Sequence, residues 1–276
     1  MAEPPLGLIA GQGVFPFLVA RGARQAGREV VCVGLRGHAD PSLAREVDVY
    51  VPVGTLRLGQ WIRTLRRYGV REAIMVGRVS KSQMHARTRW LTYLPDWRTV
   101  RIYFTRLRHD KRDHAVLLAV ADELASEGIT LIDSTAYSKD HLATPGVMTR
   151  HQPTDAQRLD AQFGFPLCRM ISDADIGQAL AVVDKDVIAV EAVEGTDRMI
   201  ERAGQYCRGR SWTLIKVANA KRDLRVDVPS VGVQTIENLH AAGGRCLVLE
   251  AGQTILLEKP RVLERADQLG IAVLGM

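Results

Sequence analysis

The chain has 276 residues, of which 46% are hydrophobic and 25% are charged. These values are typical of a globular protein and exclude the disordered, collagen-like and disulfide-scaffold classes. The net charge of +6 is unevenly placed, because the segment from Arg57 to Arg112 contains fifteen Lys or Arg and only three Asp or Glu. This basic block carries +12 and the remainder −6, a distribution that predicts an anionic partner of a kind left open by charge alone.

No apolar run approaches the ~20 residues of a membrane-spanning helix. The sequence from Met1 to Pro5 has neither the basic nor the apolar region of a secretory signal, so we expect a cytosolic chain. No two of the four cysteines have a C-x-x-C spacing, and we therefore expect small buried side chains instead of a structural zinc site. The phosphate-loop, nucleophile-elbow and H-E-x-x-H motifs are also missing from the sequence.

The first half of the chain alternates between strand and helix patterns. Strands are predicted at residues 6–10, 29–34, 47–51, 73–77 and 129–132, and helices at 14–26, 57–68 and 113–127. This rhythm predicts an α/β fold whose N-terminal domain, residues 1–134, is Rossmann-like with a parallel, doubly wound sheet. Residues 135–154 are rich in Ser, Thr, Pro, Gly and Asp and are predicted to be an inter-domain linker.

The second half predicts another α/β domain, residues 155–276, with a mixed sheet and helices. We expect helices at 155–162, 175–181, 196–206, 233–242 and 260–269. A hairpin is predicted at 182–193, and strands at 212–217, 224–228, 245–250 and 271–274.

The first candidate site is Gly11-Gln12-Gly13, between a strand and a helix. Glycines here let a phosphate approach the N–H groups at a helix N-terminus. The dinucleotide fingerprint is incomplete, because its third position is Pro16 and the second strand runs into Arg36 with no acidic residue to bind a ribose. A nicotinamide cofactor is thus disfavoured, while a plain tight turn and contact with a phosphate, sugar or nucleotide remain open.

The second candidate is the segment from Glu191 to Asp197, which ends a strand and opens a helix. Thr196 is predicted to cap that helix, whose free N–H groups favour an anion. The alternatives are that Thr196 is only a structural cap and that Glu191 and Glu194 form a solvated edge.

The third candidate is the segment from Asp223 to Pro229. In a strand, Asp223, Arg225 and Asp227 share one face, close to the rim of the sheet where a metal or a water is held. Arg225 would keep Asp227 ionised, as a metal ligand or general base requires. A surface ion pair explains the same pattern equally well.

The fourth candidate is the helix start at Lys111-Arg112-Asp113-His114. Asp113 is predicted as an N-cap, and Lys111 either contacts a phosphate or is solvated. The seven histidines of the chain are scattered, and none is assigned a catalytic role.

Taken in order, these pieces resemble the UDP-2,3-diacylglucosamine pyrophosphatases of the lipid A pathway, the type distinct from the calcineurin-like enzyme. The resemblance spans residues 6–274 and rests on Gly11-Gln12-Gly13, Gly77-Arg78-Val79-Ser80, Lys111-x-Asp113, Asp175-Ile176-Gly177-Gln178, Glu191-x-x-Glu194-Gly195-Thr196-Asp197, Lys216 and Arg225-x-Asp227-x-Pro229-x-x-Gly232. It implies two α/β domains with the substrate between them. It also implies Mg²⁺-dependent hydrolysis to UMP and 2,3-diacylglucosamine 1-phosphate (lipid X), with water attacking the β-phosphorus.

The resemblance also implies residue roles. Asp227 matches the essential aspartate and is the expected Mg²⁺ ligand. Because Mg²⁺ is usually held by one or two carboxylates together with substrate phosphates, Asp113 or Glu191 is the expected helper. The expected substrate-binding residues are Gly11, Gln12, Gly13, Ser80, Lys111, Gln178, Gly195, Thr196, Asp197, Lys216 and Arg225. The chain departs from the family pattern at residues 219–222 and at His114, which puts the neighbouring phosphate contacts and the metal geometry in question.

Several kinds of partner fit these sequence features. A non-catalytic protein that binds a nucleotide sugar or a lipid is one alternative to the enzyme. A nucleic-acid-binding protein that stacks bases on the aromatics of block 84–112 is another, but the block matches no known module, so we predict no nucleic-acid partner. Aromatics among arginines also suit the anionic inner leaflet, so we expect peripheral contact with the inner face of the inner membrane. A homodimer remains one alternative for the assembly.

Overall fold

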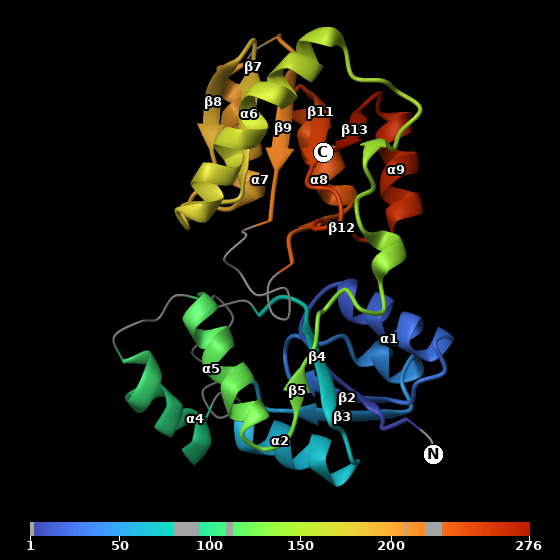
Figure 1. Ribbon diagram of the computed structural model, residues 1–276, viewed down its shortest axis with the longest axis vertical. Coiled ribbons are helices and arrows are strands. Elements are labelled where there is room, and N and C mark those ends of the chain that lie inside the picture. Colours follow the sequence, from blue (N-terminus) through green and yellow to red (C-terminus); the bar gives the residue numbers. More distant parts are fainter. Residues whose placement is uncertain (1–2, 80–93, 109–112, 208, 219–227) are drawn as a thin grey trace. The chain divides into compact units, whose positions relative to one another are not determined.

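The computed structural model describes residues 3–79, 94–108, 113–207, 209–218 and 228–276, with residues 113 and 114 described by their backbone only (Figure 1). The described residues form two compact units. Unit 1 extends to Ser138, and unit 2 begins at Lys139. This division falls inside the predicted linker, residues 135–154.

The sheet of unit 1 has the strand order β3-β2-β1-β4-β5, and every neighbouring pair is parallel. The strands are β1 (Leu6–Ala10), β2 (Val30–Leu35), β3 (Val49–Val53), β4 (Glu72–Val76) and β5 (Thr130–Leu131). Every residue of β1 and β2 is buried, as continuous apolar runs covered on both faces require. The predicted parallel α/β layer is confirmed.

Helices cover both faces of this sheet. They are α1 (Phe15–Gln25), α2 (Leu58–Arg67), α4 (Trp97–Ile102) and α5 (Asp113–Ala125), and a π-helical turn, η2 (Tyr103–Leu107), continues α4. Successive strand residues point to opposite faces, so Leu8 packs in a core with α1 residues and Ile9 in a core with residues of α2 and α5. Unit 1 is therefore a three-layer sandwich (Figure 1).

The sheet of unit 2 has the order β6-β13-β11-β9-β7-β8 and is mixed. β11 is parallel to β9 and β13, whereas β7 is antiparallel to both of its neighbours and β6 is antiparallel to β13. The strands are β6 (Gly146–Val147), β7 (Ala179–Val183), β8 (Asp186–Val190), β9 (Trp212–Lys216), β11 (Gly244–Leu249) and β13 (Ala272–Gly275); β10 (Ser230–Val231) and β12 (Ile255–Leu256) form a separate pair. The predicted mixed sheet is confirmed, and β6 lies within residues 135–154.

Helices also lie on both faces of the second sheet (Figure 1). They are α6 (Asp155–Asp173), α7 (Thr196–Tyr206), α8 (Val233–Ala241) and α9 (Lys259–Gln268). On β9, Ile215 packs in a core with α6, whereas Leu214 packs in the other core with α7, α8 and α9.

One predicted helix of unit 2, residues 175–181, is wrong. Residues 179–181 begin β7, where they are buried, and a short apolar run reads alike in a buried helix and a buried strand. The β7–β8 hairpin is confirmed, and its turn residues Asp184 and Lys185 both have positive φ, 50° and 61°, as a type I′ turn requires. α6 is longer than predicted because its helix continues through Pro166. Of the predicted strand 224–228, only Val228 is among the described residues.

Candidate functional site

Three segments of the chain meet at one edge of the unit 2 sheet. Lys216 ends β9 and pairs with Ala179, the first residue of the antiparallel strand β7, so Gln178 lies beside the carboxyl end of β9. The backbone N–H of Glu191, just after β8, donates to Ala179 O at 2.9 Å. This edge, at the carboxyl ends of the parallel strands, is where open α/β sheets bind ligands.

A buried carboxylate joins these segments. Glu191 is 6% exposed. Its Oε1 accepts a hydrogen bond from Thr196 Oγ1 at 2.8 Å, and its Oε2 accepts one from the Gln178 backbone N–H at 3.3 Å. Lys216 is 5% exposed, and its Nζ donates to Thr196 Oγ1 at 3.1 Å. We call these four residues, Gln178, Glu191, Thr196 and Lys216, the Glu191 cluster.

The cluster fixes what the hydroxyl of Thr196 can do. Its one proton is donated to Glu191 and one of its lone pairs accepts from Lys216, so the hydroxyl links two buried charged groups. The predicted capping role is wrong, because Gly195 is the N-cap of α7 and Thr196 is its first helical residue. Gly195 has φ +83°, a backbone conformation that a glycine adopts without strain.

The N-terminus of α7 lies next to this cluster. Its first intrahelical hydrogen bond runs from the Met199 N–H to Gly195 O, so the N–H groups of residues 196–198 precede the helical ladder. The side chain of Asp197, in the first turn, accepts a hydrogen bond from Asn238 Nδ2 of α8 at 3.0 Å. An acidic residue there is favourable for the helix dipole.

The two glutamates of this segment have different environments. Glu194 pairs with Arg202, and hydrogen bonds from backbone N–H groups and from Arg202 lower the pKa of the Glu194 carboxyl. Glu191 is buried in the cluster, so the prediction of a solvated edge is wrong for it. Nothing in the sequence distinguishes the two residues except that Glu191 comes directly after a strand.

The backbone of Gln178 is held from two sides. Its N–H donates to Glu191, and its carbonyl accepts from the Val217 N–H at 3.0 Å. At Gly177, an added Cβ would lie 2.0 Å from the backbone oxygen of Glu191, so only glycine permits this approach. The Asp175-Ile176-Gly177-Gln178 motif therefore has a structural reason in its third residue.

A second buried carboxylate lies at the same edge of the sheet. Glu250 follows β11, accepts a hydrogen bond from the Ala218 N–H at 2.9 Å and pairs with Arg169 of α6. It therefore fixes the backbone just after β9. Glu250 is not among the residues predicted for the site, and its only signal in the sequence is an acidic side chain directly after a buried strand.

In unit 1, the predicted Gly11-Gln12-Gly13 site is a close backbone contact. Gln12 forms an isolated antiparallel bridge with Arg78. An added Cβ on Gly11 would lie 2.8 Å from the carbonyl carbon of Gly77, and one on Gly77, which has φ +97°, would lie 2.7 Å from that of Gly11. This packing favours the tight-turn interpretation for Gly11. Gly13 has φ +110°, and no atom of the described residues lies within 4 Å of an added Cβ there.

Several predicted residues lie outside the described residues. They are Ser80, Lys111, Arg225 and Asp227, together with the side chain of Asp113. Within the described part of the chain, no group of three or more His, Cys, Asp or Glu side chains is placed to hold a metal ion. No helix among the described residues is long and apolar enough to cross a membrane.

Comparison with known proteins extends over both units. Residues 5–141 match the LpxI N-terminal domain, and residues 144–274 match the LpxI C-terminal domain. The UDP-2,3-diacylglucosamine pyrophosphatase LpxI of Caulobacter vibrioides is 32% identical over 279 aligned positions, which cover 98% of this chain and 97% of the relative. The chain belongs to the LpxI family. The predicted family is confirmed, and the chain is a homologue of this pyrophosphatase over nearly its full length.

Proposed function

We propose that the chain hydrolyses the diphosphate of UDP-2,3-diacylglucosamine to UMP and 2,3-diacylglucosamine 1-phosphate in lipid A biosynthesis. The observation that carries this proposal is its similarity, over nearly the whole of both chains, to a relative named for that substrate. The Glu191 cluster supports it, because Gln178, Thr196 and Lys216 belong to the motifs that led to the family and lie together in the fold.

The chemistry fits this edge of unit 2. Diphosphate hydrolysis needs groups that neutralise charge on the phosphate oxygens and a positioned water. The Lys216 ammonium lies 3.1 Å from the hydroxyl of the first residue of α7, so a cation and a helix N-terminus are adjacent. Both favour an anion. We propose that Lys216 and the backbone of Gly195 and Thr196 bind the diphosphate.

Asp227 and Mg²⁺ belong to this proposal as its catalytic part. Mg²⁺ is usually held by one or two carboxylates together with substrate phosphates. A site with so few protein ligands does not require a cluster of three, and the described residues contain none. Asp227 is the proposed key carboxylate and ligand, with Asp113 as a second ligand, and the ion would neutralise charge on the diphosphate. Removal of Mg²⁺ with EDTA should abolish UMP release, and added Mg²⁺ should restore it.

The decisive experiment is incubation of the chain with UDP-2,3-diacylglucosamine and Mg²⁺ in ¹⁸O-labelled water. We expect UMP release, with the label in 2,3-diacylglucosamine 1-phosphate because the β-phosphorus is attacked. Binding of the substrate without UMP release would instead indicate a non-catalytic binding protein. Label found in UMP would still demonstrate the hydrolysis, but it would refute attack on the β-phosphorus.

We also propose that the enzyme works at a membrane surface. Its proposed substrate carries two acyl chains and a diphosphate, so it is expected to reside in a bilayer with its polar end in water. Peripheral contact with the anionic inner face of the inner membrane would bring the enzyme to it. Recovery of the protein with washed inner membranes at low salt, and its release at high salt, tests this location.

A further inference from the structure

The segment that contains α4 and η2 exposes large aromatic side chains. Trp97 is 78% exposed and Phe104 63% exposed, and Leu94 and Tyr103 are exposed as well. Tyr103 and Phe104 pack edge to face, with ring centroids 5.4 Å apart. Trp and Phe are usually buried when a chain can bury them, so this exposure calls for an explanation.

The same segment is firmly attached to unit 1. Ile102 is buried in the core that contains α2 and α5, and Leu107 packs against that core. Asp96 caps α4 by accepting from the Thr99 N–H at 3.0 Å, and it also accepts from the Gly59 N–H of α2 at 2.7 Å. The exposed aromatics therefore belong to an ordered, helical element.

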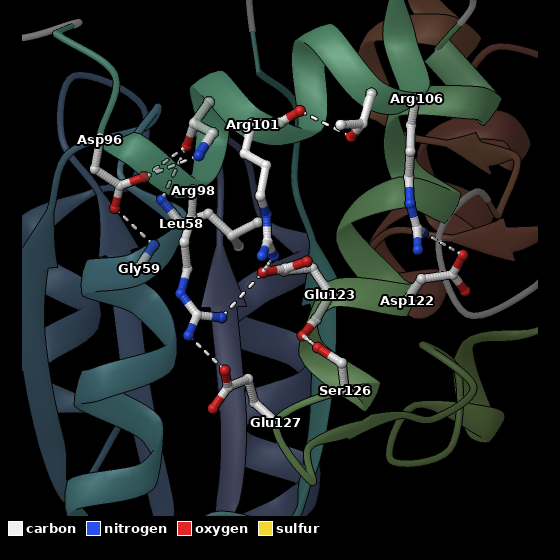
Figure 2. Close-up of polar contacts among 12 residues, drawn as sticks. Leu58, Gly59, Asp96, Arg98, Arg101, Arg106, Asp122, Glu123, Ser126 and Glu127 are labelled. Atoms are coloured by element: carbon white, nitrogen blue, oxygen red, sulfur yellow. Dashed lines mark hydrogen bonds and ion pairs between the residues drawn. The ribbon is translucent and has the colours of Figure 1, made fainter.

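Ion pairs with α5 complete the attachment (Figure 2). Arg98 pairs with Glu123 at 3.0 Å and also with Glu127, whose carboxyl pKa it lowers. Arg101 pairs with Glu123 at 2.6 Å, and Arg106 pairs with Asp122 at 2.7 Å. These arginines surround a cavity of about 460 Å³ that Glu123 and Glu127 also line, so it offers no uncompensated positive site for a phosphate.

The same short segment carries exposed aromatic side chains and partly exposed basic ones. Arg101 and Arg106 keep about half of their side chains exposed although both pair with carboxylates of α5. Residues 94–108 carry four arginines and one acidic residue, and the surrounding block keeps a net +8 when the acidic residues of α5 are counted with it. Trp and Tyr are enriched at membrane interfaces, and basic side chains are attracted to anionic lipids.

We propose that this surface, formed by Leu94, Trp97, Arg101, Tyr103, Phe104 and Arg106 and called here the α4 face, docks on an anionic lipid bilayer. The aromatics enter the interfacial layer while the arginines remain at the headgroups. Nucleic acid fits this surface less well, because its affinity depends mainly on cations available to phosphates, and three of the four arginines are paired with carboxylates. A bilayer interface, in contrast, also takes up exposed Trp and Tyr rings.

The proposed function supplies a reason for such docking, but the docking can be measured without any substrate. The test is co-sedimentation of the full chain with vesicles of phosphatidylcholine, alone or mixed with phosphatidylglycerol. The double variant Trp97→Ala/Phe104→Ala should bind the anionic vesicles at least tenfold more weakly than the wild type. The matched control Met170→Ala/Tyr206→Ala, which removes two exposed apolar side chains of unit 2, should bind like the wild type.

Circular dichroism and thermal unfolding of both variants check that the fold is kept. The conservative single variant Trp97→Phe, which keeps an aromatic ring at this position, should retain most of the wild-type binding. The proposal is overturned if the wild type does not bind the anionic vesicles, or if the double variant binds them as well as the wild type does. The proposal is also overturned if the double variant alters only the oligomeric state, which would indicate a protein partner, or only the binding of oligonucleotides, which would indicate a nucleic-acid partner.

Activity separates the α4 face from the proposed function. With substrate dispersed in detergent, the double variant should keep the wild-type rate, and with substrate in anionic vesicles it should be at least fivefold slower. A wild type that binds vesicles but never releases UMP would refute the proposed function and leave the docking surface standing.

Discussion

Replacement of Thr196 by Val tests whether the Glu191 cluster organises the site. Val has nearly the shape of Thr but lacks the hydroxyl that donates to Glu191 Oε1 at 2.8 Å and accepts from Lys216 Nζ at 3.1 Å. A hydrogen bond to a charged group is worth roughly 1.5–3 kcal/mol, and a buried partner left unsatisfied adds to the loss. Because the two hydrogen bonds share one oxygen, their energies do not add fully. We therefore expect Thr196→Val to lower the free energy of unfolding by about 3 kcal/mol.

Thr196→Ser is the matched control, because it keeps the hydroxyl and removes only a methyl group, at a cost of about 1 kcal/mol. Two measurements apply: urea unfolding followed by circular dichroism, and the initial rate of UMP release. Thr196→Val should lower kcat/KM at least tenfold, whereas Thr196→Ser should stay within about threefold of the wild type. Equal stability and equal kcat/KM for the two variants would refute the claim that this hydroxyl holds the cluster together.

Three further predictions concern the proposed catalytic carboxylate, the turn of unit 1 and the thiols. Asp227→Asn should leave folding and substrate binding intact while UMP release collapses; turnover at the wild-type rate would contradict the assignment. Gly77→Ala should destabilise the protein by about 3 kcal/mol, since it combines positive φ with a backbone clash, whereas Gly27→Ala, with positive φ and open space, should cost about 1 kcal/mol in urea unfolding. Burial raises the pKa of three thiols to about 12, so at pH 8 only about one in 10,000 is ionised and a maleimide should label them only after unfolding. Their contribution to the free energy of unfolding is constant below about pH 8.5 and falls as the pH rises toward 12, because the unfolded thiols ionise first. These thiols are Cys32, Cys168 and Cys246.

The sequence predicts most of the fold because each unit alternates apolar strands with amphipathic helices. The strands of unit 1 are continuous apolar runs bounded by turn residues, and the parallel sheet follows from their alternation with helices. The error at residues 175–181 has a specific cause: Ala179-Leu180-Ala181 is too short to show a period, and Ala favours helices. Its pairing with both β8 and β9 decides the conformation, and such pairing is a tertiary effect.

The candidate site is less predictable than the fold, because its contacts join residues of different motifs. One motif contains both Glu191 and Thr196, but only the fold brings Gln178 and Lys216 to them. Thr196 shows why local rules fail here: a Thr before a helical pattern is a good candidate for an N-cap. Gly195, which has a positive φ, is the N-cap instead. The hydroxyl of Thr196 therefore does not cap the helix and donates to the buried carboxylate of Glu191.

The basic block shows how a count along the sequence overstates the charge that a partner meets. The window from Arg57 to Arg112 ends just before the acidic residues of α5, and extending it to Glu127 adds four carboxylates and no Lys or Arg, so +12 becomes +8. Arg66, Arg98, Arg101 and Arg106 pair with three of those carboxylates. Since these pairs hold the segment in place, the exposed Trp97 and Phe104 become the sharper test of membrane docking. Removing the arginines would disturb the fold and the surface together, whereas removing the aromatics changes only the surface.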